Sequence, residues 1–186
     1  MEELEKMVSG LPYNPSDHKL VILNEKAGRL ASEYNHYYYN DRVKSDEILT
    51  SLLGSIGDNV VIRPDFRCDY GLNIRVGNNF FANFGCVILD CAEVTFGDNC
   101  MLGPHVGIYT ATHPIDPVER CSGIEFAEAV TIGNNCWIGG HAVINPGVTL
   151  GDNVVVASGS VVTKSFGSNV VIGGVPAKVL KVVIPS

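Results

Sequence analysis

Aliphatic residues return every six positions over most of the chain, and this period constrains the fold more than any other feature. The longest unbroken series consists of Ile132, Ile138, Ile144, Leu150, Val156 and Val162. A period of six fits neither the 3.6-residue turn of an α-helix nor the two-residue alternation of a plain strand. It fits a short strand followed by a corner, with the aliphatic residue pointing inward. We therefore expect a mainly β protein, a parallel β-helix in which three hexads make one coil.

Polar tetrads mark one corner of this repeat. The segments "IGDN", "VGNN", "FGDN", "IGNN" and "LGDN" begin at residues 56, 76, 96, 132 and 150. Gly, Asn and Asp suit tight corners because they tolerate left-handed backbone conformations. The hexads predict a stack of coils over residues 54–173. A β-sandwich is the alternative, but it would need two-residue alternation.

One interval breaks the rhythm, because 36 residues separate Phe96 from Ile132. Residues 114–131 show no hexad and contain Pro114 and Pro117. Prolines suit a turn better than a paired strand, so we expect a loop extruded from the β-helix over 114–131. A degenerate coil is the alternative. In either case His113 stands at the start of the interruption.

The two ends of the chain lack the hexad. Residues 1–53 predict a helical cap segment, with one helix starting after Ser16 or Asp17 and a short second helix capped by Ser45. Such helices would cover the open end of the stack. Residues 174–186 form a C-terminal tail, in which we expect Pro176 to open a short helical turn.

Composition narrows the classes of partner. The net charge of −7, from 13 basic and 20 acidic residues, argues against nucleic-acid binding. No apolar run is long enough to span a bilayer, and the acidic first residues do not resemble a signal peptide. The six cysteines contain no CxxC pair, so we expect reduced thiols in a cytoplasmic protein.

Few motifs of known chemistry are present, since the chain has no P-loop, GxGxxG, GxSxG or HExxH segment. His113 is a candidate general base, with Glu125 as a candidate to orient its ring; a structural loop histidine is the equal alternative. The separations between His105, His113 and His141 do not match one coil, so we expect neither stacking nor a metal site. Lysines near the C-terminal end suggest an anion site or, alternatively, an ordinary solvated surface.

The segments "FRCDYGLNIRVGNNFFANF", "CMLGPHVGIYTATHPIDPVER" and "GGVPAKV" carry a more specific signal. With the helical N-terminal segment, they make the chain resemble the maltose/galactoside O-acetyltransferases, a family of hexapeptide-repeat acyltransferases, and the maltose type most closely. The resemblance implies a left-handed β-helix, a homotrimer with active sites between subunits, acetyl-CoA as cosubstrate and a small sugar as acceptor.

Site residues follow from the resemblance position by position. The catalytic histidine falls on His113, and no metal is implied. Acceptor-binding positions fall on Asp17, Asp69, Asn83 and Asp90. Positions that bind the cosubstrate fall on Trp137, Gly140, Ser158, Thr163, Lys164, Lys178 and Lys181. Cys91 and Asp69 depart from the galactoside pattern, which has an acid and a serine there, so the acceptor stays open among a glucose-type sugar, a galactoside and a modified sugar.

The reaction that we expect is direct acetyl transfer within a ternary complex, with His113 removing the proton from a sugar hydroxyl. A covalent route through an acyl-cysteine at Cys86 or Cys91 is the alternative. Two alternatives from other classes are a metal-dependent hydratase on the same scaffold and a solenoid without catalytic activity.

Overall fold

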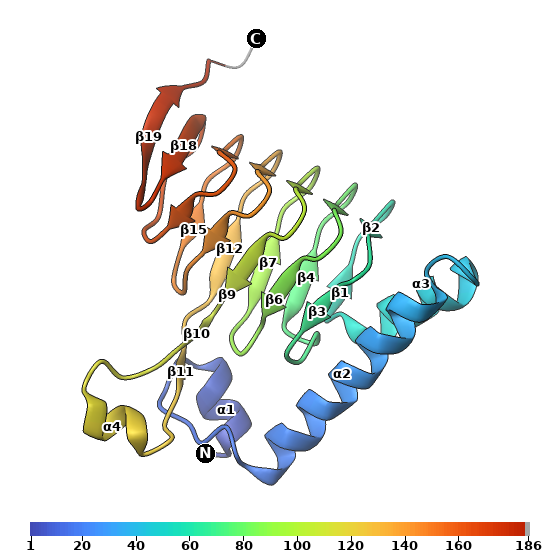
Figure 1. Ribbon diagram of the computed structural model, residues 1–186, viewed down its shortest axis with the longest axis vertical. Helices are drawn as coiled ribbons and strands as arrows, with labels where there is room; N and C mark the ends of the chain where they lie inside the picture. Colours follow the sequence, from blue (N-terminus) through green and yellow to red (C-terminus); the bar gives the residue numbers. More distant parts are fainter. Residues whose placement is uncertain (185–186) are drawn as a thin grey trace.

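The computed structural model describes residues 1–184 and contains a three-sided stack of short parallel strands, with helices along one side (Figure 1). It is a left-handed β-helix, as the resemblance implied. The first face comprises β1 (Ser55–Ile56), β4 (Ile74–Val76), β7 (Val94–Phe96), β12 (Val130–Ile132) and β15 (Thr149–Leu150). The second comprises β2 (Val61–Ile62), β5 (Phe81–Ala82), β8 (Met101–Leu102), β13 (Trp137–Ile138), β16 (Val155–Val156), β18 (Val170–Gly174) and β19 (Ala177–Val182). The third comprises β3 (Arg67–Cys68), β6 (Val87–Leu89), β9 (Gly107–Tyr109), β14 (Val143–Ile144) and β17 (Val161–Val162).

The hexad residues fill the interior of the stack, as the period predicted. All six members of the series from Ile132 to Val162 are buried. They belong to one continuous apolar cluster that runs through every coil. Burial of this column removes apolar surface from water coil by coil, which stabilises each coil through its neighbours.

The last residues of the tetrads form an asparagine ladder along one corner of the stack. The last residue of each tetrad has a positive φ between 55° and 61°, and Asn169 continues the series. Each side-chain amide bonds to the next amide along the ladder, for example Asn99 Nδ2 to Asn135 Oδ1 at 3.0 Å. Asparagine therefore supplies both the left-handed corner and a hydrogen bond between coils.

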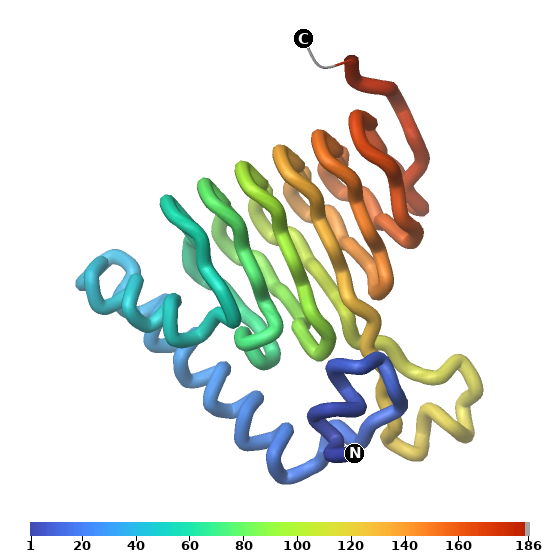
Figure 2. The backbone as a smooth tube through the Cα atoms, turned by 180° about the vertical axis from the view of Figure 1, so that it is seen from behind, coloured from blue at the N-terminus to red at the C-terminus, as the bar shows by residue number. Residues whose placement is uncertain are grey.

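The long interval is one coil plus an excursion, and the excursion has other bounds than the expected 114–131, since its stem starts at Ala111 and the coil resumes at Val130. β12 pairs directly with β7, in the register Ile132 to Phe96. The excursion between them consists of β10 (Ala111–Thr112), α4 (Pro117–Cys121) and β11 (Phe126–Ala127). β10 and β11 are antiparallel and form the stem of the excursion. Figure 2 shows this excursion beside the N-terminal segment.

Three helices form the N-terminal segment: α1 (Glu3–Val8), α2 (His18–Tyr37) and α3 (Arg42–Leu52). Asp17 caps α2, as expected, by accepting a hydrogen bond from the backbone N–H of Lys19 at 3.0 Å. The predicted cap of the next helix was wrong, because α3 starts one turn earlier with Asp41 as its cap and Ser45 is buried inside it. Within residues 1–184, no helix combines the length and the apolar character needed to cross a membrane.

The helical turn that we expected after Pro176 was also wrong. Residues 177–182 instead form β19, which turns back and pairs antiparallel with β18. The other edge of β18 pairs with β16. A returning strand satisfies the free edge of β18 with backbone hydrogen bonds, whereas a helical turn would leave that edge unpaired. Lys178 and Lys181 consequently lie on an edge strand.

Candidate functional site

A polar cavity of about 340 Å³ lies beside His113. The N-terminal segment, the third face and the stem of the excursion enclose it. Its polar lining residues are Asn24, Asp69, Tyr70, Cys91, His113 and Glu125. No lysine or arginine lines it, so the fixed charges that face the cavity are carboxylates.

The stem of the excursion positions His113. Thr112 pairs with Phe126 across the two antiparallel strands, so His113 and Glu125 are the next residues along the two strands and lie across the stem from each other. The His113 Nε2 atom lies 3.9 Å from Glu125 Oε1, and 54% of the histidine side chain is exposed. An imidazole with this exposure can meet a ligand and exchange its proton.

Asp69 and Cys91 form the opposite wall of the cavity. The Cys91 Sγ donates to Asp69 Oδ2 at 3.5 Å, and the side chain of Asn24 donates to the Asp69 carbonyl at 3.0 Å. Burial is the main cause that raises the pKa of Asp69, and the charge of Glu125 adds to it. Burial also raises the pKa of Cys91 to about 12. Cys91 is therefore a neutral thiol at neutral pH.

Asp90 lies behind this wall and does not line the cavity. Its carboxylate is fully buried and accepts hydrogen bonds from the backbone N–H groups of Asp69 at 3.1 Å, Tyr70 at 2.9 Å and Asn73 at 3.2 Å. Burial raises the pKa of Asp90 to about 6, although the backbone donors oppose the shift. In this structure Asp90 fixes the turn that carries Asp69.

A second cavity, of about 470 Å³, lies along the second face. Its apolar wall is a row of outward side chains on neighbouring strands, since Phe81 pairs with Met101 and Met101 with Trp137. Met101 is 50% exposed and Trp137 is 52% exposed. Polar and small residues complete the lining, among them Asn83, Gly140 and Ser158. A Cβ atom on Gly140 would lie 3.1 Å from Pro104, so the coil leaves little room for a side chain there.

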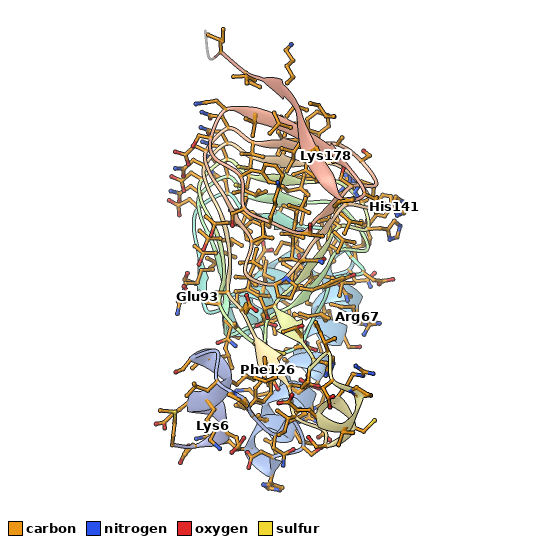
Figure 3. The ribbon with its side chains drawn as sticks, turned by 90° about the vertical axis from the view of Figure 1, so that its left-hand side faces the viewer. Lys6, Arg67, Glu93, Phe126, His141 and Lys178 are labelled. Carbon is orange, nitrogen blue, oxygen red and sulfur yellow. The ribbon has the colours of Figure 1, made fainter. Side chains whose placement is uncertain are left out.

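The two cavities share no lining residue. The structure therefore brings Asp69 together with His113, but it places Asn83 and Trp137 at a different surface of the same chain. Asp17 lines a third hollow with Glu2 and His18. Thr163, Lys164, Lys178 and Lys181 line none of these three cavities. The second cavity is called the Trp137 cavity below, and the one beside His113 the His113 cavity. Figure 3 shows Lys178 on the same side of the stack as His141, which lines the Trp137 cavity.

The expectation that the coil histidines do not stack was wrong. The rings of His105 and His141 are 5.0 Å apart and inclined by 24°. The excursion adds about as many residues as one coil contains. His105 and His141, which are 36 positions apart, therefore occupy equivalent corners of neighbouring coils. Among residues 1–184, no three His, Cys, Asp or Glu side chains gather as a metal-binding group.

Sequence reasoning missed several lining residues. Met101 could have been found from the sequence, because it lies 36 positions before Trp137, the same interval that separates Phe96 from Ile132. Tyr70 and Asn24 carried no signal, because their proximity depends on how α2 packs against the third face. Tyr13, whose hydroxyl bonds to Glu125 at 2.8 Å, belongs to a segment without periodicity.

Comparisons with known proteins agree with this architecture. Two family models match: the bacterial transferase hexapeptide (six repeats) over residues 129–164 and the maltose acetyltransferase hexapeptide capping motif over residues 6–57. A putative acetyltransferase of Dictyostelium discoideum is 54% identical over 181 residues, which cover 97% of this chain and 94% of the relative.

Two solved structures are similar over nearly their full lengths. A maltose O-acetyltransferase from Clostridium difficile 630 is 47% identical, with a TM-score of 0.97 and coverage of 100% of this chain and 99% of the other. A galactoside acetyltransferase in complex with coenzyme A is 36% identical, with a TM-score of 0.95 and coverage of 99% and 92%. With its hexapeptide coils, its capping segment and these relatives, the chain belongs to the hexapeptide-repeat acetyltransferases, in the branch of the maltose and galactoside O-acetyltransferases.

Proposed function

We propose that this protein transfers the acetyl group of acetyl-CoA to a hydroxyl group of a sugar, directly and within a ternary complex. The observation that carries the proposal is the half-exposed imidazole of His113 in a cavity lined by Asp69 and Glu125. Carboxylates and neighbouring polar groups suit the many hydroxyls of a sugar, which donate and accept hydrogen bonds.

His113 is the general base in this proposal. One ring nitrogen, with its lone pair, takes the proton of the acceptor hydroxyl while the oxygen forms its bond to the acetyl carbon. As the bond between that carbon and sulfur breaks, the imidazolium returns the proton to the leaving sulfur. The ring thus ends neutral, and the two products are the acetyl ester and the free thiol.

The Trp137 cavity is the proposed site for the acetyl donor, which supplies the thioester carbonyl. The row of Phe81, Met101 and Trp137 offers an apolar wall to a pantetheine-like chain, and Gly140 and Ser158 border it. Lys164, Lys178 and Lys181 lie toward the C-terminal end of the stack, and their ammonium groups suit phosphates.

Separate cavities on one chain also support a homotrimer with its active sites between subunits. The His113 cavity and the Trp137 cavity open at different surfaces, and a neighbouring copy would bring one against the other. Burial of Met101 and Trp137, both half-exposed in the single chain, would favour such an interface. In this assembly Asn83 would reach the acceptor from the partner side.

Asp69 is the residue on which the proposed acceptor class rests. Asp69 contacts Cys91, so the carboxylate at position 69 occupies the part of the cavity where the galactoside pattern places an acid at position 91. We propose a glucose-type sugar as acceptor, with a galactoside or a modified sugar as the alternative.

The test is thiol release from acetyl-CoA, measured for the wild type and for His113→Ala with maltose, glucose, a galactoside and a compound without hydroxyl groups. We expect acceptor-dependent release that the substitution lowers by about 10²- to 10⁴-fold. Binding of CoA, measured by calorimetry, should be unchanged in the variant. Acceptor-dependent release that survives in His113→Ala would refute the role of the base.

A further inference from the structure

We infer that Tyr13 and Glu125 act as a pair of positioning residues that hold one tautomer of His113 ready for proton transfer. The inference rests on the proposed function, in which His113 is the base. It assigns a positioning role to Tyr13 of the N-terminal capping segment, a segment whose Asn24 lines the same cavity as His113.

Tyr13 and Glu125 are joined at three points, although 112 positions separate them. The backbone N–H of Tyr13 donates to the Glu125 carbonyl at 3.0 Å, and the N–H of Glu125 donates to the Tyr13 carbonyl at 3.1 Å. The Tyr13 hydroxyl donates to Glu125 Oε2 at 2.8 Å. This two-residue bridge attaches the capping segment to the stem of the excursion.

The tyrosine ring is itself immobilised. Tyr13 is 2% exposed and belongs to a small apolar cluster with Met7, Leu20, Tyr70 and Ala127. Because its neighbours come from α1, α2, the third face and β11, the direction of the hydroxyl is set by packing from several elements. Glu125 therefore receives a hydrogen bond from a fixed donor and loses most of its rotational freedom.

The bond from Tyr13 occupies Oε2, and Oε1 is the oxygen that faces His113 at 3.9 Å. This separation is beyond hydrogen-bond length, and a shift of about 1 Å closes it, as occurs when catalytic groups tighten around a ligand. An ionised carboxylate only accepts hydrogen bonds, so the ring nitrogen that faces it must carry the proton. The opposite nitrogen is then left with the lone pair that takes the hydroxyl proton.

The same contact supports the charged intermediate. When His113 holds the transferred proton, the imidazolium is adjacent to a carboxylate of opposite charge. No proton passes to Glu125 in this proposal, and the proton moves only between the acceptor oxygen, the imidazole and the leaving sulfur. Loss of this contact should therefore affect kcat more than the KM for either substrate.

The experiment measures the tautomer of His113 directly, by ¹⁵N NMR of protein labelled at histidine, with His113→Ala to assign the signal. We expect one predominant tautomer in the wild type. In Glu125→Gln, Tyr13 still donates to the amide oxygen, so the amide N–H₂ faces the ring and favours the opposite tautomer. Tyr13→Phe keeps the buried ring but frees Glu125, and we expect a mixture. Glu119→Gln removes an exposed charge on α4 of the same excursion and serves as the matched control.

Turnover supplies the second measurement. A charge-assisted hydrogen bond corresponds to a loss in kcat of about 10- to 100-fold for Glu125→Gln, and a neutral one to about fivefold for Tyr13→Phe, with little change in KM. The double variant should be no slower than Glu125→Gln alone, because both act through one contact.

The two proposals can fail separately. An equal mixture of tautomers in the wild type, or a ratio that Glu125→Gln does not alter, would overturn the inference even where acetyl transfer is observed. A fixed tautomer in a protein that transfers no acetyl group would instead overturn the proposed acetyl transfer and leave the positioning of His113 upheld. Thermal unfolding of Tyr13→Phe distinguishes a specific effect on kcat from loss of the folded capping segment.

Discussion

The buried carboxylate of Asp90 makes the stability of this protein depend on pH in a direction opposite to that of most paired acids. Asp90 is fully buried, and burial raises its pKa from 3.8 to about 6 against the opposing effect of its backbone donors. The folded state therefore holds the proton more tightly than the unfolded state does. The free energy of unfolding should fall as the pH rises from about 4 to above 6.

The magnitude follows from the shift. The difference between 3.8 and about 6 corresponds to a full loss of about 3 kcal/mol of stability, at 1.36 kcal/mol per pKa unit. Between pH 4.5 and pH 7.5, about 2 kcal/mol of this loss should occur, because the unfolded carboxyl is already largely ionised at pH 4.5. The remainder falls at lower pH.

The assay compares denaturant unfolding of the wild type and Asp90→Asn at several pH values. The amide places an N–H₂ group against a backbone donor, which costs about 1–3 kcal/mol at every pH. The stability advantage of the wild type over Asp90→Asn should shrink by about 2 kcal/mol from pH 4.5 to pH 7.5. Glu119→Gln, which removes an exposed acid, should show no such change. An advantage that grows with pH would refute the reasoning, since it would mean that the three backbone donors outweigh burial.

Two further perturbations test the covalent alternative and the asparagine ladder. Burial raises the pKa of both Cys86 and Cys91, so replacing both by alanine should keep thiol release within about tenfold of the wild type, against a far larger loss in His113→Ala. A loss as large as that of His113→Ala would instead establish the acyl-cysteine route. Asn135→Ala loses two ladder hydrogen bonds and puts at φ 57° a residue that tolerates the left-handed conformation less well than asparagine, so the free energy of unfolding should fall by about 2–4 kcal/mol. Asn135→Gly should be less destabilised by about 1 kcal/mol, and equal losses in the two variants would rule out a backbone contribution.

Local repetition made most of the fold predictable from the sequence. Each hexad residue contacts equivalent residues one coil away, so the period alone locates the buried column and the corners. The excursion was recognisable because it breaks that period, and His113 was recognisable because it stands at the break. The start of α2 was predictable because Asp17 acts on the first turn of its own helix.

Contacts between segments that are distant in the sequence decided the rest. The tail after Pro176 became a strand because the free edge of β18 offered more hydrogen bonds than a helical turn could. Asp90 and Asp69 look alike in the sequence, yet one is turned inward onto three backbone donors and the other faces the cavity.

The environment of His113 depends in the same way on tertiary packing. The sequence determines the repeat, the corners, the excursion and the position of His113 at the break in the period, because each of these follows from spacing along the chain. Only the tertiary structure decides that Tyr13, 112 positions from Glu125, directs that carboxylate toward the imidazole. The physical reason is that side-chain orientation is fixed by packing among α1, α2, the third face and the excursion, and no periodicity records which of these surfaces meet.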